Sequence, residues 1–214
     1  ANTGPLFSAP GGPAAHQPGG APWWWHTPED TIDKIDAEVL RRDTRVYALA
    51  TLRALAAPLL PLQPEAAARE IATTLAAYAE AAGSRFDLEP TRQRAEQLVA
   101  AAAALAPRLE ALRDQEELAA DRLRSLNRRL RALDRPLVQL AFTAEPPYEQ
   151  DLAIPIPPLP LLEPVRRLAG LEPGSDEAHF LETELVRRRN RAGELLRQAL
   201  SAAADVLAEL DAIG

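Results

Sequence analysis

The stretch from Leu98 to Leu140 reads LVAAAAALAPRLEALRDQEELAADRLRSLNRRLRALDRPLVQL, and it decides the fold of this chain. Its apolar positions recur at alternating spacings of four and three residues. This spacing aligns apolar side chains along one side of a helix, as in helices that pack together at a shallow angle. We call these positions the apolar seam. They are Leu98, Ala102, Leu105, Leu109, Leu112, Glu116, Ala119, Leu123, Leu126, Leu130, Leu133, Leu137 and Leu140.

Two interruptions of this helical stretch are expected. Pro107 has no backbone N–H and its ring crowds the preceding turn, so the helix should kink or break close to Ala106. A second interruption is expected between Asp114 and Glu117, because the apolar seam is occupied there by Glu116.

Helices are also expected on both sides of this stretch. The first runs from about Ala37 to Ala57, and the second runs from Pro64 to Ala82. A long one starts at Ser175 or Asp176 and ends near Ala212. Their inner faces are assigned to Val39, Val46, Leu49, Leu52 and Leu55, to Ile71, Leu75 and Tyr78, and to Phe180, Leu181 and Leu185.

The segment from Glu145 to Pro164 holds seven prolines, which favour an extended backbone. The apolar residues between these prolines predict that the segment is pinned against the helices, although a ligand for proline-binding domains is the alternative. A short helix near Leu162 to Ala169 should follow.

Composition limits the functions that the chain can have. The net charge of −7 over 214 residues argues against a nucleic-acid role. The sequence contains no cysteine, which excludes disulfides. It also contains no run of 18 apolar residues, so no membrane-spanning helix is predicted. Lys34 is the only lysine. The arginines between Arg122 and Arg131 are interpreted as a solvated face with acidic partners, with an anion-binding patch as the alternative.

The residues from His26 to Asp36, HTPEDTIDKID, follow three consecutive tryptophans and have two interpretations. In the first, they start a helix: Thr27 is the N-cap, Pro28 takes the first helical position, and Asp36 caps the next helix. In the second, His26 is a metal ligand, because a histidine beside aromatic residues and acids is typical of one side of a metal site.

The segment from Trp23 to Asp36 resembles the last metal-binding segment of the co-catalytic zinc aminopeptidases, which are related to bacterial leucyl aminopeptidases and to glutamate carboxypeptidase. In that family the segment has an aromatic residue, the zinc-binding histidine, Thr or Ser, two further residues, and an Asp-Thr pair. The resemblance implies that His26 binds one of two zinc ions. It also implies that Asp30 and Thr31 shape the loop without binding metal, and that Trp24 and Trp25 form a wall of the substrate cleft.

The implied site is incomplete in this chain. Two zinc ions need a second histidine, a bridging aspartate, other carboxylates and a glutamate as general base, and in the family these lie upstream of the final histidine. Residues 1–25 contain His16 but no acid. We therefore expect this chain to be the C-terminal portion of a longer zinc exopeptidase acting on peptides, and we assign no catalytic residue to it.

A weaker resemblance covers Pro64 to Gly214, where the order of elements is similar to the helical dimerisation domain of the transferrin receptor and glutamate carboxypeptidase group. It implies a homodimer. The peptidase family is often exported, so the resemblance to that family favours an exported protein. The expected fold is mainly α: residues 1–60 are a loop-rich remnant of an α/β zinc peptidase domain with its closing helix, and residues 61–214 form an antiparallel helical bundle. A non-catalytic receptor-like relative and an unrelated helical interaction module are the alternatives.

Overall fold

A computed structural model describes residues 24–113, 119–146, 148–151 and 156–212, and it is mainly helical, as expected. The chain divides into two compact units at Ala57 and Pro58. Within the described residues, unit 1 is 24–57, and unit 2 is the remainder from residue 58 onwards. No helix among the described residues is both long enough and apolar enough to cross a membrane.

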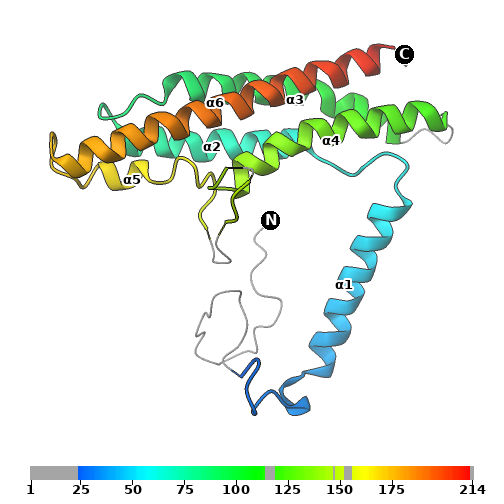
Figure 1. The fold of residues 1–214 in the computed structure, drawn as a ribbon. Helices are drawn as coiled ribbons and strands as arrows, with labels where there is room; N and C mark the ends of the chain where they lie inside the picture. The colour runs from blue at the N-terminus through cyan, green and yellow to red at the C-terminus, as the bar shows by residue number, and fades with distance from the viewer. Residues whose placement is uncertain (1–23, 114–118, 147, 152–155, 213–214) are drawn as a thin grey trace. The chain divides into compact units, whose positions relative to one another are not determined.

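Unit 1 contains a 3-10 helix, η1, at Ile32–Lys34 and the helix α1 at Ala37–Ala56 (Figure 1). The N-cap of α1 is Asp36, as predicted, and its carboxylate accepts hydrogen bonds from the amides of Glu38 and Val39. Most of the predicted apolar side of α1 is not covered by any residue that the structure describes. Its exposed members are Val46, Leu49, Leu52 and Leu55.

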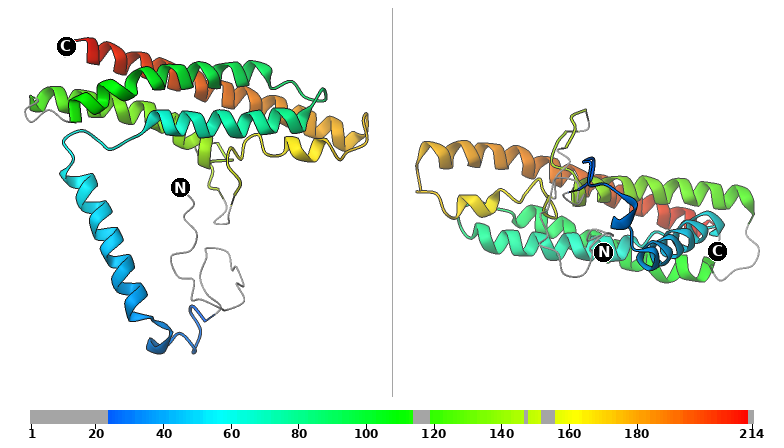
Figure 2. Two further views of the ribbon diagram at one scale, coloured as in Figure 1. Left: turned by 180° about the vertical axis from the view of Figure 1, so that it is seen from behind. Right: turned by 90° about the horizontal axis from the view of Figure 1, so that it is seen from below.

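Unit 2 is a bundle of helices. Its elements are α2 at Pro64–Ala82, α3 at Glu89–Arg113, α4 at Ala120–Phe142, α5 at Val165–Leu168 and α6 at Asp176–Asp211. The longest helix, α6, runs along the bundle (Figure 2) and packs against both α3 and α4.

Ion pairs show the direction of α6 relative to its neighbours. Arg108 of α3 pairs with Asp211 at 2.7 Å, and Arg189 donates a hydrogen bond to the carbonyl of Asp87 just before α3, so these two helices run parallel. Arg129 in the first half of α4 pairs with Glu209 near the end of α6, so α4 and α6 run antiparallel.

Local signals explain both ends of α2 and the start of α6. Pro64 occupies the first turn of α2, where its missing N–H costs nothing. Gly83 ends α2 with φ 54°, a left-handed conformation that glycine adopts without strain. At the start of α6 the hydroxyl of Ser175 accepts a hydrogen bond from the amide of Ala178. These boundaries confirm the sequence predictions.

Three details differ from the predictions. A kink or a break was expected near Ala106, and the helix α3 continues through Pro107 without a break; Leu105 and Leu109 on either side are buried, and their packing holds the turn together. It also begins well before Leu98, because the carboxylate of Asp87 accepts a hydrogen bond from the amide of Glu89 and starts the helix there. Phe180, predicted on an inner face, is 78 % exposed. The interruption expected between Asp114 and Glu117 lies outside the described residues.

The apolar seam forms the core of unit 2. The seam residues of α3 are buried, and so are those of α4 from Leu126 onwards, whereas Leu123 is half-buried and Ala119 is exposed. Leu185, Leu196, Ala199 and Val206 of α6 are buried in the same core. Ile71, Leu75 and Tyr78 of α2 are buried as predicted.

Side chains fix the connections between helices. The Tyr78 hydroxyl donates a hydrogen bond to the carbonyl of Pro158 at 2.6 Å, and its burial raises the pKa of Tyr78. Leu159 and Leu161 are buried in the core. The end of the proline-rich segment, from Pro158 to Leu161, is thus pinned against the bundle, whereas Tyr148 is fully exposed and Leu152 and Ile154 lie outside the described residues.

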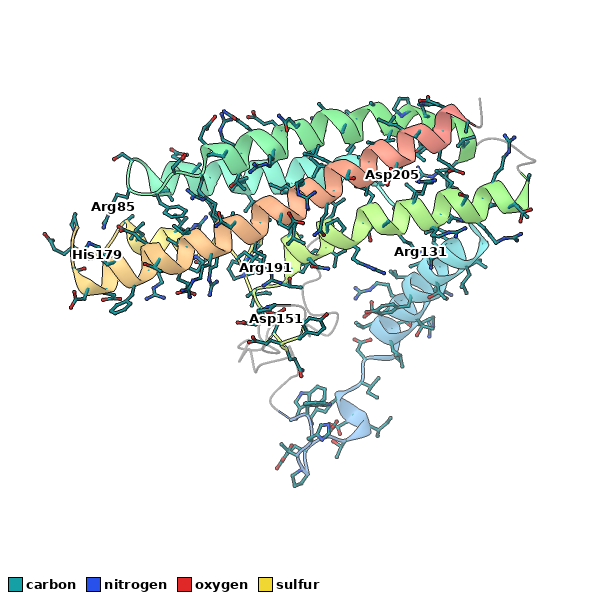
Figure 3. All side chains as sticks on the ribbon, turned by 45° about the horizontal axis from the view of Figure 1, so that its top comes forward. Arg85, Arg131, Asp151, His179, Arg191 and Asp205 are labelled. Carbon is teal, nitrogen blue, oxygen red and sulfur yellow. The ribbon has the colours of Figure 1, made fainter. Side chains whose placement is uncertain are left out.

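Three arginines each bridge two backbone carbonyls, and we call them the arginine forks. Arg85 donates to the carbonyls of Leu168 and Leu171, both at 2.6 Å. Arg113 donates to those of Leu60 and Leu62, at 3.2 and 2.9 Å. Arg191 on α6 donates to those of Ala144 and Glu145, whose amides donate to Asp151 at 2.9 and 3.0 Å (Figure 3).

Leu130→Ala is predicted to destabilise the protein by about 2–5 kcal/mol, because it removes a fully buried side chain and leaves a cavity. Val138→Ala is the matched control on the same helix, where the side chain is 44 % exposed, and it should cost less than about 1 kcal/mol. Urea unfolding followed by circular dichroism measures both. Similar costs for the two variants would contradict the assigned core.

Candidate functional site

The residues around His26 form a tight loop before η1, and we call residues 24–31 the His26 loop. The amide and the hydroxyl of Thr27 both donate to the carbonyl of Trp24, at 3.1 and 2.7 Å. The amide of Asp30 donates to the carbonyl of Thr27 at 3.0 Å. No helix begins at Thr27, so that prediction is wrong. The hydroxyl and the amide of Thr27 close a turn on Trp24 instead.

The backbone of His26 has φ 62°, in the left-handed region that residues other than glycine seldom adopt. Such a conformation persists only where neighbouring contacts hold it. The first of two such contacts is the hydrogen bond that the amide of His26 donates to the Asp30 carboxylate, at 3.3 Å. The turn on Trp24 is the other.

The His26 ring is exposed and packs against the ring of an aromatic neighbour. Its centroid lies 3.9 Å from that of the Trp25 ring, with the two planes inclined at 75°. Trp25 is 52 % exposed and Trp24 is half-buried. The loop therefore presents an imidazole on the surface beside one indole, and Trp23 lies outside the described residues.

The three aspartates that follow His26 already have partners. Asp36 caps α1, and the Asp30 carboxylate accepts from the His26 amide. Asp33 pairs with Lys34 at 2.7 Å and accepts a hydrogen bond from the Thr31 hydroxyl. The hydrogen bonds from Lys34 and then from Thr31 lower the pKa of Asp33 to about 2.

No group of three or more potential metal-binding side chains lies together in the part of the chain that the structure describes. His179, in the first turn of α6, is exposed (Figure 3). His16 lies outside the described residues. A metal ion bound by His26 would thus need its other ligands from residues other than the described ones.

A second candidate site lies on α4, where the arginines at 124, 128, 131 and 135 are spaced by four, three and four residues and are all exposed. We call this the arginine stripe. Exposed Val138 and Phe142 continue it with the same spacing. Solvated arginines with acidic partners were predicted between Arg122 and Arg131, and this is confirmed for Arg124, which pairs with Asp121, and for Arg129, which pairs with Glu209. The other three stripe arginines make no hydrogen bond or ion pair with any described residue.

Comparison with known proteins finds no match: no family model fits the chain, and no curated protein or solved structure is significantly similar to it.

Lys34→Gln is predicted to raise the pKa of Asp33 from about 2 towards the ordinary value of 3.8, because it removes the largest cause of the depression. Wild-type Asp33 should stay ionised as the pH falls to about 2, whereas the variant should gain its proton near pH 4. Carboxyl chemical shifts recorded by NMR during an acid titration measure this. Lys34→Arg keeps the cation and should keep the low pKa.

Proposed function

We propose that this chain belongs to a zinc-dependent exopeptidase of the aminopeptidase type, and that His26 supplies one ligand to its metal centre. The observation that carries the proposal is the exposed His26 imidazole, held by a left-handed backbone and by Asp30. It stands within a segment that resembles the last metal-binding segment of the family.

The geometry of the His26 loop suits the role of a single ligand. A zinc ligand needs a nitrogen lone pair that is free to point at the ion, and an exposed ring offers one. Ring orientation has to be fixed by neighbours, and Trp25 packs against the His26 ring at 3.9 Å. Asp30 acts on the backbone of His26, so its proposed role is to shape the loop, as is that of Thr31.

Zinc, when bound, would lower the pKa of a water molecule and polarise the carbonyl of the scissile peptide. The part of this chain is to orient one ligand and, through Trp24 and Trp25, to border the cleft that admits the peptide. The bridging aspartate, the general base and the other ligands would come from residues outside those described.

His26→Ala in the full-length enzyme is predicted to lower kcat/KM by about 100-fold or more, because the metal centre loses a direct ligand. Zinc content, measured by atomic absorption, should fall in parallel. His179→Ala is the matched control, since it removes an exposed histidine on α6 and should change neither quantity. Unchanged turnover in the His26 variant would remove the proposal.

A helical dimerisation or binding module without catalysis is the second candidate, and the arginine stripe favours it. Like charges three and four residues apart on one helix repel each other. A partner that carries carboxylates would relieve this repulsion, and Arg is the cation best suited to pair with carboxylates at interfaces. Val138 and Phe142 would add apolar contact at one end of the same surface.

The double variant Arg131→Glu/Arg135→Glu is predicted to weaken binding of a labelled poly-glutamate peptide by about tenfold or more, because the stripe then carries opposing charges. Fluorescence anisotropy at low and high salt measures the affinity. Arg45→Glu/Arg53→Glu makes the same charge change at exposed positions of α1 and serves as the control. Equal losses in both variants would show that net charge alone is responsible.

A further inference from the structure

A cavity of about 350 Å³ lies in unit 2 between the first turns of α3 and the middle of α6. Thr91 and Arg94 line it from α3. Arg189, Gly193 and Arg197 line it from three successive turns of α6, and Asn190 lies beside them. Its volume falls within the range of small-molecule sites in proteins.

The guanidinium of Arg94 crosses α6 at Gly193. A Cβ atom added to Gly193 would lie only 3.3 Å from Nη1 of Arg94. Glycine weakens the interior of a helix, so its presence in the middle of α6 needs a local reason. The close passage of Arg94 supplies that reason, and it places Arg94 between Arg189 and Arg197 along the groove.

Polar groups in the cavity lack partners. Thr91 is 1 % exposed, and its hydroxyl makes no hydrogen bond with any described residue. The side chains of Arg94 and Asn190 are exposed to solvent and make no hydrogen bond or ion pair with another described residue. The Thr91 hydroxyl therefore keeps its hydrogen-bonding capacity free for a ligand in the cavity.

The groups without hydrogen-bond partners do not belong to the backbone at the start of α3. The amide of Glu89 donates to the Asp87 carboxylate at 2.9 Å. The amides of Thr91 and Arg92 donate to the carbonyl of Leu88, at 3.0 and 2.9 Å. The groups in the cavity that remain free to bind a ligand are therefore side chains.

The other charged groups of the cavity are engaged. Glu194 holds Arg197 through two hydrogen bonds, at 2.9 and 2.6 Å, and these lower the pKa of Glu194. Arg189 donates to the carbonyl of Asp87 at 2.8 Å and lies over the Phe86 ring at 5.1 Å from its centre. Three guanidinium groups face two carboxylates, those of Asp87 and Glu194, which leaves one positive charge. Arg94 is the group that carries it.

We propose that this cavity binds a small organic anion through its carboxylate or phosphate group. The Arg94 guanidinium donates to the anionic oxygens, and the Thr91 hydroxyl and the Asn190 amide complete the contacts. The cavity is larger than a lone oxyanion, so the organic part of the ligand occupies the remaining space along the groove. This site is independent of the metal centre proposed for His26.

Isothermal titration of the full chain with sodium phosphate and with sodium acetate, at constant ionic strength, tests the proposal. Millimolar binding of either anion is expected, and Arg94→Gln should weaken it by about tenfold or more. Arg53→Gln removes an exposed arginine of α1 and should leave the affinity unchanged. Binding of phosphate alone or of acetate alone identifies the anionic group.

Thr91→Val separates binding from packing, because it replaces the hydroxyl with a methyl group of similar size. The variant should keep the melting temperature of the wild type without ligand, since the packing volume is preserved, but should bind the anion several-fold more weakly. The proposal is overturned if neither anion binds, or if Arg94→Gln binds as well as the wild type. A Thr91→Val variant of unchanged affinity would remove Thr91 from the site.

Discussion

Burial of the apolar seam against α6 is the constraint on which unit 2 depends. A helix as long as α6 gains most of its stability from packing and not from intrinsic propensity. Leu130 and Leu133 of α4 are fully buried, and the inner face of α6, which packs against α4, carries the small residues Ala199 and Ala203 beside its leucines. Small residues let helices approach closely, and Gly193 extends this row to the place where Arg94 crosses α6. The small residues on the inner face of α6 therefore allow both the close packing of the core and the passage of Arg94 at the anion cavity.

Much of this bundle was predictable because its signals are local. The spacing of the apolar seam assigned the buried faces of α3 and α4, and Pro64 with Gly83 set both ends of α2. The start of α3 was missed because its signal, the carboxylate of Asp87 two residues before Glu89, precedes the apolar pattern. Phe180 was misplaced because one large apolar side chain near a helix start fits an inner face equally well by periodicity.

The candidate sites were less accessible to sequence reasoning. The resemblance singled out His26 and Asp30, but the left-handed backbone that links them depends on several weak contacts and has no residue signature. The cavity between α3 and α6 was not foreseen, since Thr91 and Arg189 are far apart in the sequence and meet only when the helices pack in parallel. The spacing of the arginine stripe, in contrast, is visible in the sequence once the inner face of α4 is assigned.

The arginine forks limit which cations the interhelical connections accept. Each fork places the N–H groups of one planar guanidinium on two carbonyl oxygens at once. An ammonium carries the same charge, but it is a compact group on a flexible stem and does not reproduce this fixed paired geometry. The connections that end at Leu171, Leu62 and Glu145 therefore depend on the shape of the arginine side chain as well as on its charge.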